Sequence, residues 1–357
     1  MNAVKILHIA DIHFGRKISG LSSEKSELRR NETYITLEHT LNRFADAQIV
    51  LIAGDIFDAD DNTDYVSGVK KLFENHASKR FFIACGNHDC LETPVIKKLC
   101  HNLSPNVHVF EDKMESVYIE ELDTCVYGMG FGAEHSYTSF LHNFIVKDYS
   151  HINLMVMHAD VDTDSKYNSI STAEIGASRL DYLALGHIHR YSGILKNRET
   201  YYAYPGVLEP QGFDETGECG VIYGEISKEV VNLDFYPASC RRYHCMNVDL
   251  GAFSSEQELI SYLSSNINSD DLYRIILSGN RGNFEPNIKL YQNMLQPFYL
   301  EVIDDSIYSD NILDYIEETG LKGRTAFYLK NLSEDNKYSH DIFLKAAEIL
   351  TKLMCKG

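Results

Sequence analysis

The sequence predicts an α/β protein whose main domain is a two-sheet β-sandwich flanked by helices, followed by a smaller α+β domain and C-terminal helices. Apolar runs alternate with helical patterns up to residue 90, which is typical of βαβ units with parallel strands. Short strand patterns then dominate as far as residue 236, and the composition shifts between residues 241 and 247. Because 357 residues exceed the usual size of one domain, we expect a main domain at 1–245, an α+β domain at 246–308 and a helical segment at 309–357.

The first part of the chain is predicted to form two βαβ units. Its apolar runs at 4–10, 48–53 and 80–85 are bounded by glycine or polar residues, as in strands that are buried on both faces. The first helix is indicated by apolar residues at three- and four-residue spacing, namely Tyr34, Leu37, Leu41 and Phe44. The second helix is indicated by Val66, Val69, Leu72 and Phe73.

Further strands are predicted after these units. Antiparallel additions that form a second layer are expected at 107–110, 116–119 and 125–129. Two more apolar runs have the character of buried strands, at 152–157 and 182–185. The last strands of the main domain are expected at 200–204, 220–226 and 230–236.

The α+β domain is predicted from one helix and two strands. Ser255 and Glu258 have the spacing of a capping box, so a helix is expected to begin there. Strands are expected at 272–277 and 299–303. The final segment is helical, with an apolar face that is more typical of core packing than of docking, formed by Ile342, Ala346, Ile349, Leu350 and Leu353.

Metal-ligand side chains follow five of the predicted buried strands. They are Asp11, His13, Asp55, Asn87, His158, His187 and His189. In open α/β sheets, ligands bind outside the carboxyl ends of the strands, so these side chains are expected to share one cleft. They are too many for one tetrahedral zinc ion. They suit two divalent ions that share a carboxylate, roughly 3.5–4 Å apart, which activate a shared water for attack at phosphorus. Mixed oxygen and imidazole ligands favour manganese, iron or zinc over calcium or magnesium.

Composition restricts the partners and the compartment. Lys and Arg number 33 against 52 Asp and Glu, which gives a net charge of −19. Phosphate contacts dominate nucleic-acid affinity, so such a protein is expected to hold DNA weakly unless a partner supplies positive charge. No apolar run reaches the ~18 residues that span a bilayer, and no signal-peptide pattern precedes the first strand. Eight cysteines without Cys-x-x-Cys spacing predict a reduced, cytoplasmic protein rather than a disulfide framework.

The motifs resemble those of the calcineurin-like metallophosphoesterases. The similarity rests on Asp11-x-His13, Gly54-Asp55, Gly86-Asn87-His88-Asp89, His158 and Gly186-His187-x-His189, in order over residues 4–189. It implies that one metal is held by Asp11, His13, Asp55 and His189, and that Asp55 bridges to a second metal held by Asn87, His158 and His187. It also implies that His88 stabilises the transition state or protonates the leaving oxygen, while Asp89 orients His88.

Longer segments around these motifs are similar in sequence to SbcD-type DNA exonuclease subunits. The similar segments are 7–15, 51–58, 181–190, 204–206 and 212–220, and a capping-domain resemblance covers 298–305. Cys219 departs from the pattern, because the family often has a basic residue there. The resemblance implies manganese-dependent cleavage of DNA phosphodiesters by a homodimer that works with an SbcC-like coiled-coil ATPase. Arg190, directly after the histidine pair, is expected to contact the substrate.

Three other functions remain open at this stage. A phosphatase acting on proteins or metabolites is disfavoured, because the segment after Asp55 contains no arginine to hold a dianionic monoester. A phosphodiesterase for a small nucleotide is disfavoured by the added domain, and a scaffold that has lost catalysis is disfavoured by the intact ligand set. Of the remaining polar residues, His8 is expected to pack within its strand without binding metal. Asp58 is expected either to help arrange the metal site or to cap its loop.

Overall fold

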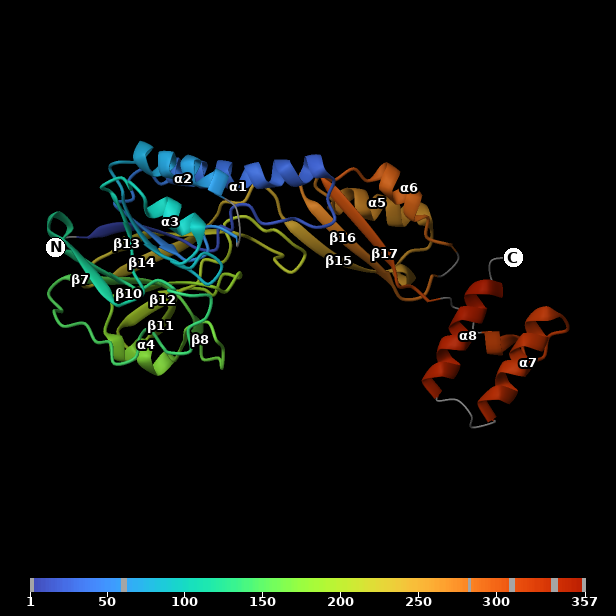
Figure 1. The fold of residues 1–357 in the computed structure, drawn as a ribbon. Coiled ribbons are helices and arrows are strands. Elements are labelled where there is room, and N and C mark those ends of the chain that lie inside the picture. The colour runs from blue at the N-terminus through green and yellow to red at the C-terminus, as the bar shows by residue number, and fades with distance from the viewer. Residues whose placement is uncertain (1–2, 59–62, 282–283, 308–311, 335–339, 355–357) are drawn as a thin grey trace. The chain divides into compact units, whose positions relative to one another are not determined.

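The computed structural model describes residues 3–58, 63–281, 284–307, 312–334 and 340–354 (Figure 1). The chain divides into two compact units, Met1–Arg242 and Tyr243–Gly357. The mixed α/β class, with two six-stranded sheets and flanking helices in the first unit, confirms the predicted fold class. The finer division of the second part at residue 308 stays a prediction.

The first sheet of the first unit has the strand order β14-β13-β1-β2-β3-β4. Its parallel core consists of β1 (Val4–Ile9), β2 (Ile49–Ala53), β3 (Arg80–Ala84) and β4 (Val107–Val109). The antiparallel additions are β13 (Gly220–Ile226), which pairs with β1, and β14 (Val231–Pro237). The expectation that 107–110 joins the second layer was wrong. The helix before it returns the chain to the same sheet edge, where β4 pairs in parallel with β3.

The second sheet has the order β11-β12-β10-β7-β6-β5. Its parallel strands are β6 (Thr124–Gly128), β7 (Ile152–His158), β10 (Tyr182–Gly186) and β12 (Thr200–Ala203). Only its edges are antiparallel, formed by β5 (Glu115–Ile119) and β11 (Leu195–Asn197). The expected antiparallel pairing is therefore confirmed for 116–119, while 125–129 pairs in parallel with β7 on its other side.

Three hydrophobic layers hold the first unit together. Helices α1 (Ser23–Arg43), α2 (Thr63–Asn75) and α3 (Pro94–Cys100) pack on the outer face of the first sheet, and α4 (Thr172–Ser178) packs on the outer face of the second (Figure 1). Alternate residues of β1 show how the pleat divides these layers, since Leu7 faces the helices and Ile6 faces the second sheet. The central strands β2, β7 and β10 are thereby buried on both faces, so a site on them can form only at their ends.

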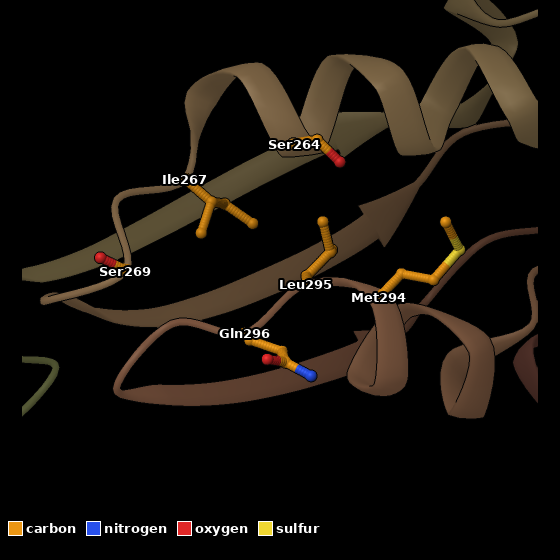
Figure 2. A pocket seen from close by; sticks show the side chains of 6 residues that line it. All are labelled: Ser264, Ile267, Ser269, Met294, Leu295 and Gln296. Atoms are coloured by element: carbon orange, nitrogen blue, oxygen red, sulfur yellow. The ribbon is translucent and has the colours of Figure 1, made fainter.

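The second unit begins with a three-stranded parallel sheet. Its strands are β15 (Tyr243–Asp249), β16 (Leu272–Ser278) and β17 (Tyr299–Asp304). Helices α5 (Glu256–Asn266) and α6 (Ile288–Met294) share its core. The Ser255 hydroxyl accepts the N–H of Glu258 at 3.3 Å, which confirms the helix start. A pocket of about 160 Å³ lies beside α5 and α6, lined by Ser264, Ile267, Ser269, Met294, Leu295 and Gln296 (Figure 2).

Two further helices, α7 (Leu321–Glu334) and α8 (His340–Met354), have a separate small core. Ala346 and Leu350 of the predicted apolar face pack in that core. Ile342, Ile349 and Leu353 of the same face are 50–66% exposed, so the expectation of a buried face is only partly fulfilled. A hairpin with few apolar residues to share cannot cover a whole helix face.

Two expectations from composition can be compared with the described residues. The cysteines described are free thiols, and Cys85, Cys90 and Cys219 are buried. Over the described ranges, no helix combines the length and the apolarity that a bilayer crossing requires. The cytoplasmic location itself stays a prediction.

Candidate metal centre

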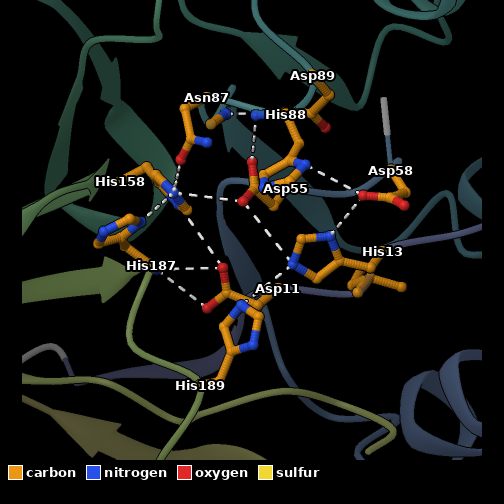
Figure 3. Close-up of polar contacts among 12 residues, drawn as sticks. Asp11, His13, Asp55, Asp58, Asn87, His88, Asp89, His158, His187 and His189 are labelled. Atoms are coloured by element: carbon orange, nitrogen blue, oxygen red, sulfur yellow. Dashed lines mark hydrogen bonds and ion pairs between the residues drawn. The ribbon is translucent and has the colours of Figure 1, made fainter. Parts of the chain in front are cut away.

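The five predicted strand ends meet at one place between the two sheets (Figure 3). The first sheet contributes residues that follow β1, β2 and β3, namely Asp11, His13, Asp55, Asn87, His88 and Asp89. The second sheet contributes residues at the ends of β7 and β10, namely His158, His187 and His189. Because β1, β2 and β3 are mutually parallel, as are β7 and β10, their carboxyl ends share one edge in each sheet.

The backbone at this edge is sharply turned. Asp11, His13, Asp55 and His187 all have positive φ angles, of 49°, 50°, 46° and 105°. Non-glycine residues rarely adopt this region, and such strain concentrates at functional sites. A Cβ on Gly186 would lie 1.7 Å from the carbonyl oxygen of Ala53, so only glycine lets the two sheets approach here.

The first group of candidate ligands consists of Asp11, His13 and His189. One ligand atom from each lies within 4.8 Å of the others. His13 Nε2 and His189 Nε2 are 3.2 Å apart, so both imidazoles aim the same nitrogen at one point. Both oxygens of Asp11 accept the backbone N–H of His187, at 3.1 and 3.0 Å, which fixes this carboxylate against the second sheet.

The second group contains Asp11, Asp55 and His158. His158 Nε2 lies 3.4 Å from Asp55 Oδ2 and 3.0 Å from Asn87 Oδ1. His187 Nδ1 lies 3.2 Å from the same His158 nitrogen. Asp55 Oδ2 is also 3.8 Å from His13 Nε2, so this carboxylate stands between the two groups. That is the position that a bridging ligand requires.

The electrostatics of the cluster fit divalent cations. Asp11 and Asp55 are almost fully buried side by side. Burial raises the pKa of Asp11 well above its usual range, although His189 opposes this. At Asp55, burial also raises the pKa, but His158 and His13 outweigh it and the net pKa is lowered. Two buried carboxylates among imidazoles form a mixed O and N donor set, and that set fits two divalent ions of the manganese, iron or zinc type.

His88 stands beside this donor set and is paired with Asp58. His88 Nδ1 lies 3.1 Å from Asp58 Oδ1, and the same oxygen is 3.6 Å from His13 Nδ1. The hydrogen bond that Asp58 accepts from this imidazole raises the pKa of His88, although burial opposes it. The His88 side chain is 44% exposed, so its free Nε2 edge can meet an incoming substrate.

The expected contact between Asp89 and His88 needs correction. Asp89 Oδ2 accepts the backbone N–H of Ile56 and of Phe57, at 2.7 and 3.1 Å, and Asp89 Oδ1 accepts that of Gly86 at 2.8 Å. These bonds occupy its carboxylate, so Asp58 is the acid that lies against His88. Asp89 instead ties the loop after β2 to the loop after β3 and thereby fixes Asp55 relative to Asn87.

Three supporting contacts were not predicted from the sequence. Glu215 Oε1 lies 2.7 Å from His189 Nδ1, which leaves Nε2 to face the metal position. Arg16 donates to the same oxygen at 3.0 Å. The imidazole Nδ1 of His158 lies 3.2 Å from the carbonyl oxygen of Ala53, which orients that ring in the same manner. Glu215 belongs to the segment 212–220 that carried the family resemblance, and that was the only signal for it.

The structure also places the remaining predicted residues. Arg190 is exposed next to His189, and no partner for its guanidinium is found among the described residues. His8 is fully buried, with Nδ1 2.8 Å from the Tyr182 hydroxyl and Nε2 3.1 Å from the Leu185 carbonyl. It is thus a core residue of β1. Cys219 is buried as well, and burial raises the pKa of its thiol to about 12.

Comparison with known proteins agrees with this geometry. The family model of calcineurin-like phosphoesterases matches residues 4–191, more than half of the chain. The DNA double-strand break repair protein Mre11 of Aeropyrum pernix is 26% identical over 270 residues, covering 69% of this chain. YhaO of Bacillus subtilis, an uncharacterised metallophosphoesterase, is 22% identical over 250 residues, covering 65% of this chain. The alignments span 64% and 60% of those two relatives. The chain belongs to the calcineurin-like phosphoesterases, hydrolases of phosphate esters that use a dinuclear metal site.

Proposed function

We propose that this protein hydrolyses phosphodiester bonds of DNA with two divalent cations, as a nuclease subunit of the SbcD type. One cation is held by Asp11, His13, Asp55 and His189. The second is held by Asp55, Asn87, His158 and His187. Two such cations lower the pKa of a water and stabilise the charge that develops on phosphorus.

The protein supplies the remaining chemistry through His88. Asp58 holds Nδ1 of this imidazole, which leaves Nε2 to donate a proton to the leaving oxygen or to bind the phosphoryl oxygens. Asp89 and Glu215 act indirectly. Asp89 fixes the loops that carry Asp55 and Asn87, and Glu215 fixes the ring of His189. Arg190 is the proposed substrate contact on the exposed side of the histidine pair.

The observation that carries the proposal is the convergence of donors from both sheets around Asp55, with His88 beside them. A diester is favoured over a monoester, because the segment after Asp55 brings no cation to the site. Ile56 and Phe57 are buried, and Asp58 adds a negative charge next to His88. The printed name of the Aeropyrum pernix relative, a DNA double-strand break repair protein, supports DNA as the diester.

Manganese is the proposed metal, with iron and zinc as the other candidates that the donor set favours. We further propose a homodimer that works with an SbcC-like coiled-coil ATPase. The net charge of −19 supports the need for such a partner, because this chain has few cations with which to displace counterions from DNA.

The test compares three substrates under matched manganese concentrations: linear DNA, a phosphopeptide and a small diester such as bis(p-nitrophenyl) phosphate. The proposal expects hydrolysis of DNA and of the small diester, with the phosphopeptide essentially untouched. Faster turnover of the phosphopeptide than of DNA would contradict the nuclease. Turnover of the small diester alone would favour a small-nucleotide phosphodiesterase instead.

A further inference from the structure

A row of aromatic rings lies beside the metal centre and is not used by the mechanism above. The ring of Tyr167 contacts that of His187, with centroids 5.1 Å apart. His135 contacts Tyr167 at 5.6 Å and Tyr137 at 6.3 Å, in both cases edge to face. The aromatic row, which we define as Tyr167, His135 and Tyr137, thus leads away from the proposed metal ligand His187. It ends at Tyr137, which is 79% exposed.

One cation lies on this row. Lys166 Nζ is 5.3 Å from the centre of the Tyr167 ring and 2.9 Å from His135 Nε2. The Nδ1 atom of His135 is buried, so only the faces of the rings and the Lys166 ammonium group are open to a ligand. The row therefore offers stacking faces and one ammonium group.

Hydrogen bonds fix the row relative to the metal centre. The backbone N–H of Ser136 donates to the Lys166 carbonyl at 2.9 Å, and the N–H of Asn168 donates to the Ser136 carbonyl at 2.9 Å. The buried side chain of Asn168 in turn donates to the carbonyl of His158 at 2.9 Å. Because the row is anchored to the end of β7, a ligand that binds it loses little free energy in ordering the protein.

We infer that the aromatic row stacks unpaired bases of the DNA strand whose phosphate lies at the metal centre. This inference rests on the proposed function. Stacking is the form of binding that suits an acidic protein, because base–aromatic contacts need no net positive charge. Glu134, Asp162 and Asp164 lie in the same two loops as the row, so Lys166 is a single cation among acids. Tyr137 supplies the outer stacking face, and Lys166 contacts one phosphate of the same strand.

The test measures binding of a fluorescent dT oligonucleotide by anisotropy. The full chain is loaded with manganese and carries His88→Ala, so that the strand stays intact. Tyr137→Ala is expected to weaken binding about five- to 150-fold, the usual range for one lost stacking contact. Tyr137→Phe should bind like the parent, because the ring and not the hydroxyl makes the contact. Tyr118→Ala is the matched control, since Tyr118 is 49% exposed on β5 and bonded to Asp123.

An abasic oligonucleotide of the same length separates stacking from backbone contacts. It should bind the parent and Tyr137→Ala equally. Lys166→Gln should reduce the slope of log affinity against log salt by about 0.7, the value for one phosphate contact on a single strand. Lys113→Gln, which removes a lysine paired with Glu111, should leave that slope unchanged. Tyr137→Ala should also leave it unchanged.

Equal binding of dT by the parent and Tyr137→Ala would refute the proposed stacking of bases on the aromatic row. An equal loss on dT and on the abasic strand would overturn it as well, because bases would then not matter. Cleavage of dT by the wild-type chain is measured separately. If DNA is cleaved while Tyr137→Ala binds normally, only the stacking role of the row is refuted. If DNA is neither cleaved nor bound, the proposed function is refuted, and the stacking role with it.

Discussion

The residue that distinguishes catalysis from metal binding in this account is His88. It forms a third group of possible ligands with His13 and Asp58, but it belongs neither to the group of Asp11, His13 and His189 nor to that of Asp11, Asp55 and His158. We predict that His88→Ala keeps both metals but lowers turnover about 100- to 10,000-fold, the usual contribution of general acid–base catalysis. Asp55→Ala should lose metal and activity together. Metal analysis alongside kinetics checks this, and a His88→Ala protein without metal would show that the roles are wrongly assigned.

Asp58 gives a second prediction at the scale of one residue. It acts through His88 and touches no reacting atom, so Asp58→Asn should lower turnover less than His88→Ala does. Asp58 raises the pKa of His88. As the pH is raised, the activity of Asp58→Asn should therefore begin to fall at a lower pH than that of the wild type. A full pH profile of both proteins measures the shift. Asp89→Asn is the comparison, and a shift in that variant instead would restore Asp89 as the partner of His88.

His8 permits a prediction about stability. Burial lowers its pKa to about 3 from the ordinary 6.5, so the folded protein keeps the ring neutral between its bonds to Tyr182 and Leu185. The unfolded chain takes up a proton below pH 6.5. The folded state therefore loses up to about 1.4 kcal/mol per pH unit from this residue as the pH falls from 6.5 toward 3. In His8→Gln, the free energy of unfolding should fall less steeply from pH 6 to pH 4. Parallel pH curves for both proteins would refute the assignment.

At the scale of an element, the end of α1 depends on one buried lysine. Lys79 Nζ donates to the carbonyl oxygens of Phe44, Ala45 and Ala47 at 2.6, 2.9 and 3.3 Å, and the residue is 1% exposed. Lys79→Met should remove all three of these hydrogen bonds, although the Phe44 carbonyl still accepts the N–H of Ala47 at 3.0 Å, and destabilise the protein by on the order of 3 kcal/mol. Urea unfolding measures the loss. Lys71→Met, at an exposed position of α2, should change stability little.

The elements also show how far sequence reasoning reaches. The ligand-bearing strand ends could be predicted, because an apolar run and the polar residues that end it are both visible in the local sequence. The sheet that residues 107–109 join could not be predicted, since the pairing of β4 with β3 depends on where α3 returns the chain. The contact between Glu215 and His189 spans 26 positions along the chain and appears only when the loop after β12 folds back. Likewise Asp89 is next to His88 in the sequence and Asp58 is far from it, yet the loop geometry brings Asp58 against the His88 ring.

At the scale of the whole molecule, charge is the main constraint. A net charge of −19 repels a polyanion, although salt screens this beyond roughly 8 Å at physiological ionic strength. We predict that the protein alone binds duplex DNA poorly, and that an SbcC-like ATPase increases both binding and ATP-dependent cleavage. Binding and cleavage assays at physiological salt, with and without the ATPase, check this. Nanomolar duplex affinity of this chain alone, unchanged by the ATPase, would refute the need for a partner.

The central claim is that five strand ends from two sheets build one two-metal centre. A crystal of the manganese-loaded protein, with anomalous diffraction collected at the manganese edge, tests it most directly. Two anomalous peaks on either side of Asp55 are expected, one contacting His13 and His189 and the other contacting His158 and Asn87. A single peak, or peaks away from Asp55 in a protein that still cleaves DNA, would contradict the claim.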